Sequence, residues 1–284
     1  MNENEFNVKN NIVSNNCSLL LEIVNELNKL LNYTKNNIII KTIEDSINKL
    51  NYIITENNKE IKYSDGSKYT GQVVNGLREG KGICCWLDGD KYEGEWKNNK
   101  REGIGIYHYN RQPFTGEKYI GYWKDNKREG KAIYHFNNGN RYEGDWKDNQ
   151  NEGKGIFYYN NGDVYEGDFK DFQQEGKGIL YLNNGNIYEG DFKDNKREGK
   201  GILYWNNGNR YEGDYKDNKM EGKGILYWNN GDRYEGDWKN DKREGKGILY
   251  WNNGDREMGD YLNDFKIGIH AKLNINGEIN MEEY

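Results

Sequence analysis

A Tyr-x-Gly motif returns at a spacing of 23 residues through most of this chain, and this period limits what the chain can fold into more than any other feature. The clearest repeat, residues 234–256, reads YEGDWKNDKREGKGILYWNNGDR. Its recurring residues are Tyr at position 1, Gly at 3, an aromatic ring at 5, Glu-Gly-Lys-Gly at 11–14, Ile at 15, a ring or Leu at 18 and Gly at 21. Eight repeats begin at Tyr69, Tyr92, Tyr119, Tyr142, Tyr165, Tyr188, Tyr211 and Tyr234, a decayed ninth begins at Glu257, and residues 61–68 form a leading half repeat.

Each repeat predicts one β-hairpin. Tyr-Glu-Gly-Asp-Trp-Lys and Gly-Ile-Leu-Tyr-Trp both alternate with period two, and turn-forming Asn, Asp and Gly lie between them. Successive side chains of a strand point to opposite faces, so Tyr234, Gly236 and Trp238 share one face. A repeat is therefore expected to be a strand, a tight turn, a second strand and another turn.

The register between strands depends on the turn that contains Asn-Gly. A two-residue turn pairs Tyr with position 17, whereas a three-residue turn pairs it with position 18 and joins the two apolar sets on one face. We expect the three-residue turn. All eight tryptophans then lie on one face: Trp96, Trp123, Trp146 and Trp238 at position 5, and Trp86, Trp205, Trp228 and Trp251 at position 18.

These residues resemble the MORN repeat (membrane occupation and recognition nexus), whose pattern is Tyr-x-Gly-x-Trp followed by Gly-x-Gly and a turn glycine. The resemblance implies a mainly β fold, an elongated and twisted antiparallel sheet of tandem 23-residue hairpins over residues 59–280. It also implies a role as an assembly or junction scaffold, or as a peripheral module that binds phosphoinositides or other anionic lipids.

Residues 1–58 differ in composition from the repeats: they contain no glycine, and their apolar residues follow helical spacing. Two series step by three and four residues and predict two amphipathic helices. We expect a short helical hairpin that caps the first strand edge. A dimerising coiled coil or another partner-binding element is the alternative. The two series are Leu20, Val24, Leu27, Leu31 and Ile43, Ile47, Leu50, Ile54.

Composition narrows the class of protein. A mean hydropathy of -1.19 and 31% charged residues are typical of disorder, but 14% of the residues are aromatic, which favours a folded chain. A net charge of -6 argues against a nucleic-acid partner. Three cysteines, an acidic N-terminus and apolar runs too short to span a bilayer predict a cytoplasmic location, with attachment to a membrane or cytoskeletal structure left open.

No pattern of an enzyme is present in the sequence. The chain has three histidines, lacks Ser-His-Asp, Cys-His and phosphate-loop motifs, and leaves little room outside the repeats for a catalytic domain. His108 and His135 share position 17 of successive repeats, but two strand spacings of about 4.8 Å place them too far apart for one metal ion. We therefore expect no catalytic residue, no cofactor and no metal.

The candidate contacts are of two kinds. Rings of the aromatic face, together with Phe114 in a four-residue insertion and Phe172 beside a turn, are expected to bind a protein partner or a second copy of the chain. Basic pairs at the hairpin tips are candidate contacts for anionic lipid, although acids neighbour them. In the third repeat, Tyr122 replaces an acid and Ala132 replaces glycine. The ring candidates are Trp96, Trp123, Trp146, Trp205, Trp228, Trp238, Trp251, Phe114 and Phe172, and the lipid candidates are Lys196, Arg197, Lys242 and Arg243.

Overall fold

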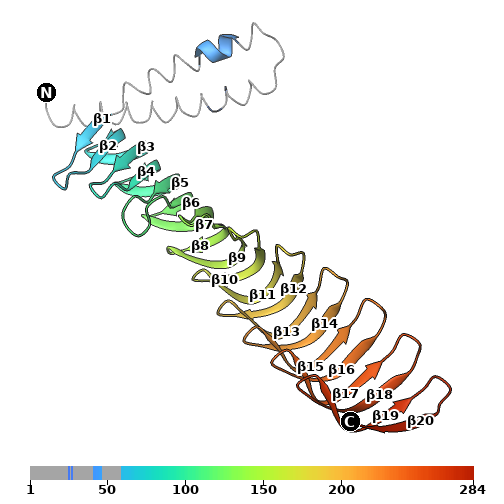
Figure 1. Ribbon diagram of the computed structural model, residues 1–284. Coiled ribbons are helices and arrows are strands. Elements are labelled where there is room, and N and C mark those ends of the chain that lie inside the picture. The colour runs from blue at the N-terminus through green and yellow to red at the C-terminus, as the bar shows by residue number, and fades with distance from the viewer. Residues whose placement is uncertain (1–24, 26, 28–40, 47–58) are drawn as a thin grey trace, which may run out of the picture. The chain divides into compact units, whose positions relative to one another are not determined.

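The computed structural model describes residues 25, 27, 41–46 and 59–284 (Figure 1). Residues 25, 27 and 41–46 are helical, which agrees with the apolar spacing around Ile43. The remainder of both expected helices lies outside the described residues. The role of residues 1–58 as a cap or a coiled coil therefore stays a prediction.

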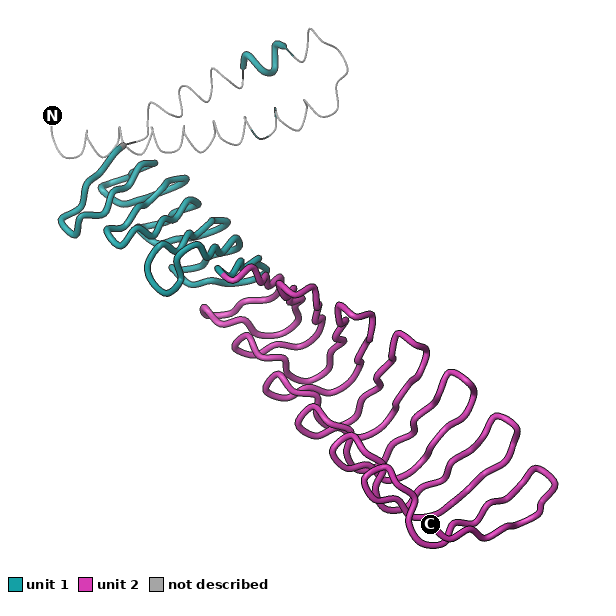
Figure 2. Tube along the Cα trace, viewed as in Figure 1, with its two compact units in different colours: residues 1–137 teal, residues 138–284 magenta. Residues whose placement is uncertain are grey.

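From residue 59 onward the chain is built of antiparallel hairpins, so the predicted mainly β fold is confirmed. Contacts divide it into two units, residues 1–137 and 138–284 (Figure 2). In unit 1, each strand pairs with the next one along the chain. Its strands are β1 (Lys59–Lys62), β2 (Lys68–Val74), β3 (Leu77–Cys85), β4 (Lys91–Lys97), β5 (Lys100–His108), β6 (Lys118–Lys124) and β7 (Lys127–His135).

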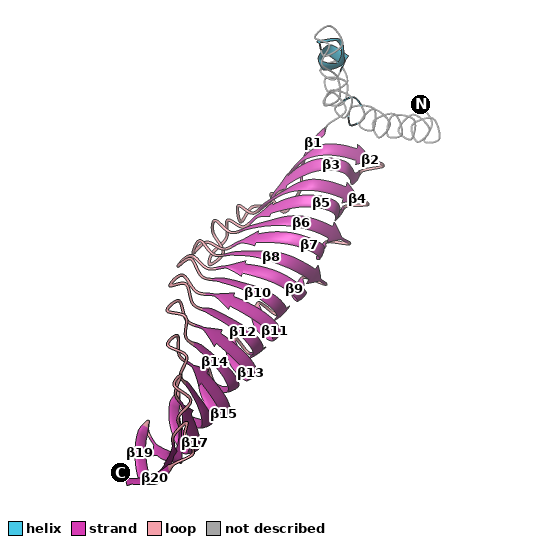
Figure 3. Ribbon diagram, turned by 90° about the vertical axis from the view of Figure 1, so that its right-hand side faces the viewer, coloured by secondary structure: helices cyan, strands magenta, loops and turns pink. Residues whose placement is uncertain are grey.

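Unit 2 repeats the same arrangement, with consecutive strands paired and turns at both margins of its sheet (Figure 3). Its strands are β8 (Arg141–Lys147), β9 (Gln150–Tyr158), β10 (Val164–Lys170), β11 (Gln173–Tyr181), β12 (Ile187–Lys193), β13 (Lys196–Tyr204), β14 (Arg210–Lys216), β15 (Lys219–Tyr227), β16 (Arg233–Lys239), β17 (Lys242–Tyr250), β18 (Arg256–Leu262), β19 (Phe265–Leu273) and β20 (Ile279–Glu283).

The first turn of each repeat is a two-residue turn of the type that matches strand twist. In the eighth repeat Lys239 pairs with Lys242, and the two residues between them, Asn240 and Asp241, have φ values of 49° and 66°. Positive φ at both central residues defines a type I′ turn, and Asn and Asp tolerate this conformation better than most other residues. The Asn and Asp at positions 7 and 8 therefore specify the hairpin.

The second turn has the predicted three residues, but it lies one residue earlier than expected. In the eighth repeat it is Asn252-Asn253-Gly254, closed by a hydrogen bond of 2.9 Å from the Trp251 N–H to the Asp255 carbonyl oxygen. Gly254 ends the turn at φ 94°, because a three-residue hairpin loop needs its left-handed residue in last place. Tyr at position 1 consequently pairs with position 16, as Tyr211 does with Leu203, and the expected pairing with position 18 is wrong. The shift is two residues, so the predicted faces are unchanged.

The core of each repeat is a tyrosine ring lying across two glycines. Tyr234 is fully buried, and a Cβ placed on Gly247 would stand 2.3 to 2.5 Å from atoms of its ring and hydroxyl. A Cβ on the facing Gly236 would lie 2.5 Å from the same hydroxyl oxygen. That hydroxyl donates a hydrogen bond of 3.3 Å to the Asp237 carbonyl oxygen. Glycine at positions 3 and 14 therefore provides the space that the ring occupies. In the third repeat position 14 is Ala132, which is buried, and the Tyr119 ring beside it is still fully buried.

Position 5 connects neighbouring repeats. Trp238 lies edge-to-face against Tyr234 of its own repeat and against Tyr211 of the preceding one, with ring centroids 5.4 and 5.1 Å apart. Phe192 contacts Tyr188 and Tyr165 in the same way at 5.1 and 4.8 Å. Such pairs add stability beyond the area that they bury. The aromatic rings thus form a core within a sheet that carries no second layer among the described residues.

The ninth repeat keeps the shape of this core with different residues. Glu257 stands in place of the tyrosine and His270 in place of the second glycine. The buried imidazole fills the space over Gly259, with its Nε2 2.9 Å from the Asp260 carbonyl oxygen, the group that a position-1 hydroxyl would reach. Glu257 Oε1 lies 2.6 Å from Lys266 Nζ and 2.9 Å from His270 Nδ1, so the buried carboxylate is paired.

The first prediction concerns the modularity of unit 2. Deleting Tyr211–Arg233 brings Leu203 opposite Tyr234, which occupies the same place in its repeat as Tyr211, and leaves every strand direction unchanged. We expect the shortened chain to unfold cooperatively in urea, followed by circular dichroism. Deleting only residues 211–221 removes β14 with its turn and reverses the direction of each later strand, so it should be far more damaging. Equal losses of stability in the two deletions would contradict this description.

Candidate binding surfaces of the repeats

The four tryptophans at position 5 belong to the core. Trp96, Trp123, Trp146 and Trp238 are 3%, 2%, 2% and 5% exposed. The indole N–H groups of Trp96 and Trp238 donate hydrogen bonds of 3.1 Å to the carbonyl oxygens of Gly82 and Gly224. These four candidate contacts are therefore buried core residues, and their truncation is expected to destabilise the fold whether or not a partner binds.

The rings at position 18 lie differently, at the margin of the aromatic face beside the Asn-Asn-Gly turns. In unit 2 this position forms what we call the ring row, and all its members are half-buried. The turn fixes each one, as in the 3.0 Å hydrogen bond from the Trp205 N–H to the Asn209 carbonyl oxygen. Trp251 lies beneath Lys272 of the next repeat, with Nζ 5.0 Å from the ring centroid. The ring row consists of Tyr159, Leu182, Trp205, Trp228 and Trp251.

Arginines at position 10 lie over the same aromatic face. The guanidinium of Arg197 is 5.4 Å from the Tyr188 ring centroid and 5.3 Å from that of Tyr215. Arg243 lies over Tyr234 and Tyr261 at 5.5 and 5.0 Å. The two members of each basic pair at a hairpin tip therefore lie on opposite faces of the sheet, with the arginine on the aromatic face and the preceding lysine on the other face.

The lysines of these pairs differ in their surroundings. Lys196 Nζ lies 2.6 Å from a carboxylate oxygen of Asp217 in the next hairpin. This hydrogen bond and charge lower the pKa of Asp217 and raise the pKa of Lys196. Lys242 is exposed at its hairpin tip. The four lipid candidates therefore do not form one basic surface.

Phe172 fills a gap in the aromatic face. It sits at position 8, where other repeats have Asn or Asp, and packs on Tyr142 and Trp146 at centroid distances of 5.6 and 5.3 Å. Asn151, 1% exposed, replaces the position-10 arginine of the preceding repeat and accepts a hydrogen bond from the Phe172 N–H. Elsewhere, as in Asn218 and Arg197, the position-8 asparagine accepts a hydrogen bond from the backbone N–H of position 10, and the position-10 arginine covers the rings. Here the position-10 side chain accepts the hydrogen bond and the position-8 side chain covers the rings, so the two positions have exchanged roles.

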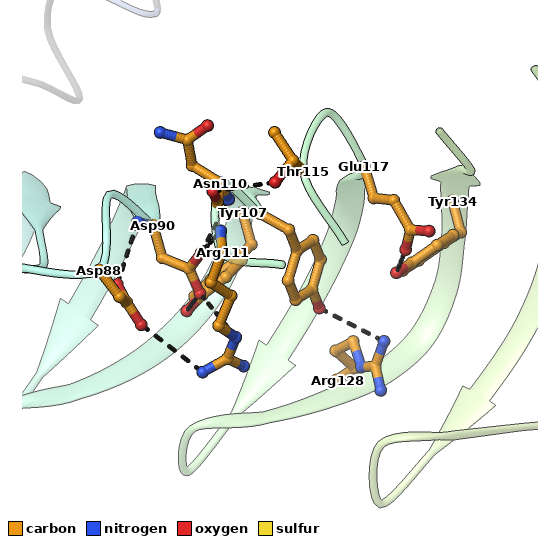
Figure 4. A network of polar contacts seen from close by, with 10 residues as sticks. Asp88, Asp90, Tyr107, Asn110, Arg111, Thr115, Glu117, Arg128 and Tyr134 are labelled. Atoms are coloured by element: carbon orange, nitrogen blue, oxygen red, sulfur yellow. Dashed lines mark hydrogen bonds and ion pairs between the residues drawn. The ribbon is translucent and has the colours of Figure 1, made fainter. Parts of the chain in front are cut away.

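The insertion in the second repeat is anchored by buried carboxylates that the sequence analysis did not single out (Figure 4). Asp90 is fully buried; its carboxylate accepts hydrogen bonds from the Tyr107 hydroxyl at 2.7 Å and the Asn110 N–H at 2.8 Å, and pairs with Arg111 at 3.3 Å. Burial, together with the bond to Asp90, raises the pKa of Tyr107. In the next repeat the Tyr134 hydroxyl donates to Glu117 in the same way.

These carboxylates anchor a loop. Tyrosine at position 16 instead of leucine, together with an acid at position 22 of the preceding repeat, was the signal for them in the sequence. Phe114 at the tip of the loop is 42% exposed and lies 6.1 Å from the Tyr109 ring. It is the most accessible of the ring candidates that the sequence predicts.

Among the residues that the structure describes, no cluster of metal ligands is found. His108 and His135 are separated by Lys118, with which both pair across strands, and no described group of three His, Cys, Asp or Glu could hold a metal ion. Cys84 is buried, which raises the pKa of its thiol, and Cys85 is exposed. Over the described part of the chain, no helix has the length and apolar character needed to cross a bilayer.

Comparison with known proteins agrees with the repeat. The family model described as MORN repeat matches residues 69–91, 92–111, 119–141, 142–164, 165–187, 188–210, 211–233 and 234–256, more than half of the chain. Comparison with curated proteins finds no significant match. Among solved structures, a streptogramin B lyase is 13% identical over 81% of this chain and 70% of its own, with a TM-score of 0.15, which is too low to support an argument.

The exchange between Asn151 and Phe172 gives the second prediction. Asn151→Arg alone forces a guanidinium against the Phe172 ring, and Phe172→Asn alone uncovers Tyr142 and Trp146, so each should lower the free energy of unfolding by about 1–3 kcal/mol. The double variant restores the arrangement of Arg197 and Asn218 and should recover much of this loss. We expect a coupling energy of about 1 kcal/mol or more in a double-mutant cycle measured by urea denaturation. Additive losses would show that the two positions do not exchange roles.

Proposed function

Because this chain belongs to the MORN-repeat family, we propose that it is a non-enzymatic scaffold that binds a protein segment through the aromatic face of its repeats. The observation that carries the proposal is the ring row, a line of half-buried apolar side chains along one margin of that face in unit 2. Aromatic residues in partly desolvated positions supply much of the energy of protein interfaces. The guanidinium groups of Arg197 and Arg243, which lie over tyrosines of the same face, add a second side chain that is enriched at such surfaces.

A repeating row fits a partner that is itself linear. The side chains of the row recur once per repeat, two strand spacings or about 10 Å apart, at Trp205, Trp228 and Trp251. One helical segment advances about 10.5 Å over seven residues, so its apolar side chains can meet successive rings of the row. A helix from another protein, or from a second copy of this chain, is therefore the partner that we propose. The cytoplasm is the proposed location, in line with the sparse cysteines.

Residues 1–58 complete the proposal as a helical cap or a partner-binding coiled coil. Only residues 25, 27 and 41–46 of this segment are described, and they are helical. The apolar spacing of the sequence is what supports the proposal for the rest.

Lipid binding is the alternative function and has weaker support. An anionic surface would need the basic side chains of the hairpin tips to point in one direction. Arg197 and Arg243 instead lie over rings of the aromatic face, and Lys196 pairs with Asp217. We therefore place protein binding ahead of lipid binding.

The third prediction tests which face binds. Trp205→Ala, Trp228→Ala and Trp251→Ala together should reduce capture of the chain's main crosslinked partner by about tenfold or more, because they remove all three tryptophans of the ring row. The matched control is Tyr204→Ala, Tyr227→Ala and Tyr250→Ala, which removes neighbouring rings from the opposite face of the same hairpins. Affinity capture with crosslinking mass spectrometry gives the readout, and circular dichroism shows that both variants are folded. Equal loss in the two folded variants, or greater loss in the tyrosine variant, would contradict the assignment.

A further inference from the structure

The face of the sheet opposite the aromatic core carries a regular series of ion pairs in unit 2. Lysine at position 13 pairs across strands with the acid at position 4 of the next repeat. In unit 2 the distance between the charged atoms is 2.7 Å for Lys154 and Asp168, and 2.5 Å for Lys177 with Asp191, Lys200 with Asp214, and Lys223 with Asp237. Lys81 and Glu95 occupy the same register in unit 1. The row formed by positions 13 and 4 is therefore charged wherever the pattern holds.

The pattern breaks between β5 and β6. There Ile104 stands at position 13 and Tyr122 at position 4, and the two residues are direct cross-strand partners. Ile104 is 67% exposed and Tyr122 is 45% exposed. Both members of one ion-pair site have thus been replaced by large apolar side chains that remain in contact with water.

A third substitution enlarges this apolar area. Position 2 is glutamate in most repeats but is Ile120 in the third, and Ile120 pairs with Ile106 on one side and Ile133 on the other. In other repeats a glutamate separates the isoleucines of position 15, as Glu235 separates Ile225 and Ile248. We call Ile104, Ile106, Ile120, Tyr122 and Ile133 the Ile–Tyr patch.

Folding does not account for the Ile–Tyr patch. Other repeats form equivalent strand pairs with lysine at position 13 and a carboxylate at position 4, so the strands do not require apolar side chains at these two positions. Side chains as exposed as Ile104 and Tyr122 gain little from burial within the chain. Contiguous exposed apolar area on a sheet face is instead typical of an interaction site.

One border of the patch is basic. Positions 17 and 23 form the adjacent row, in which Lys91, His108, Lys118 and His135 pair in order across β4, β5, β6 and β7. Burial, followed by the charges of Lys91 and Lys118, lowers the pKa of His108, so at neutral pH the lysines supply the positive charge there. Glu93, 3.3 Å from Lys91 Nζ, lies in the neighbouring row, where it pairs across strands with Ile106. A partner that carries carboxylates along one side would match this border.

The backbone hydrogen bonding of β6 limits how a partner can bind here. β6 is hydrogen-bonded to β5 on one side and to β7 on the other, so a partner cannot add a strand at this point and must present side chains. Ile106, Ile120 and Ile133 span two strand spacings, about 10 Å, close to the rise of two helical turns. A helix crossing the strands would set residues i, i+4 and i+7 over this row.

We propose that the Ile–Tyr patch is a second docking surface, which binds an amphipathic helix of another protein whose apolar stripe is flanked by Asp or Glu. The flanking acids face Lys91 and Lys118, and the apolar stripe covers the five side chains of the patch. This surface belongs to unit 1 and uses none of the residues of the ring row, so its test is independent of the function proposed above.

The probe for this proposal is a stapled helical peptide of about four turns with Leu at i, i+4 and i+7 and Glu along one flank. A matched peptide carries Lys in place of each Glu. Binding to the full chain is measured by fluorescence polarisation. The variant Ile104→Lys with Tyr122→Asp recreates the ion pair of Lys177 and Asp191, so it should be folded. The reverse control, Lys177→Ile, Glu189→Ile and Asp191→Tyr, builds the apolar patch on β11 and β12.

We expect the wild-type chain to bind the Glu-flanked peptide about tenfold more tightly than the Lys-flanked one, and the Ile104→Lys, Tyr122→Asp variant to lose about tenfold in affinity. The reverse control, in the background of that variant, should regain affinity without the preference for Glu, because its border lacks Lys91 and Lys118. Absence of binding, or equal binding by wild type and variant, would overturn the proposal. So would a wild-type dimer in sedimentation that the variant abolishes, since the patch would then bind a second copy.

Discussion

A tyrosine ring laid flat across two glycines is the contact on which this fold depends. The ring of Tyr234 occupies the space that side chains at Gly236 and Gly247 would need, and its hydroxyl reaches the Asp237 carbonyl oxygen. Missing Cβ atoms let the two strands approach the ring this closely. Neighbouring repeats are then joined by position-5 rings such as Trp238, which contacts the tyrosines of two repeats. A chain of low mean hydropathy can fold in this way, because the aromatic rings of residues 59–284 bury one another.

Packing against the position-1 tyrosines distinguishes the residues of the core from the residues that remain accessible to a partner. Position 5 is enclosed between tyrosines, whereas position 18 lies past the last strand residue and keeps part of its ring in water. Departures from the repeat are compensated where they touch this core: His270 replaces the ring lost at Glu257, and Phe172 covers the rings beside Asn151. Ile104 and Tyr122 have no such compensation, because they lie on the opposite face and stay exposed. This difference is the reason for assigning them to a partner.

Much of this structure was predictable from the period and the alternation of side chains. The hairpins, the shared face of the tyrosines and tryptophans, and the three-residue length of the second turn all follow from local chemistry. The position of that turn did not, because it depends on the left-handed conformation of Gly254 at its end. The burial of Trp96, Trp123, Trp146 and Trp238 also escaped prediction, since each of them packs on a ring of a neighbouring repeat. The pairings of Asn151 with Phe172 and of Ile104 with Tyr122 need the register as well, because each pair joins residues about 20 positions apart.

The most direct test of the tyrosine contact is an alkaline titration followed by tyrosinate absorbance and far-ultraviolet circular dichroism together. Burial raises the pKa of Tyr142 to about 12 and raises the pKa of the other position-1 tyrosines at least as far. Because these folded-state values lie above the unfolded value of about 10, the stability that the rings provide is present below pH 10 and is lost as the pH rises through the folded-state pKa. We expect at least eight of the 24 tyrosines to ionise only as the sheet unfolds. Reversible ionisation of all tyrosines in one step near pH 10, with the strand signal unchanged, would contradict a core built on buried tyrosine rings.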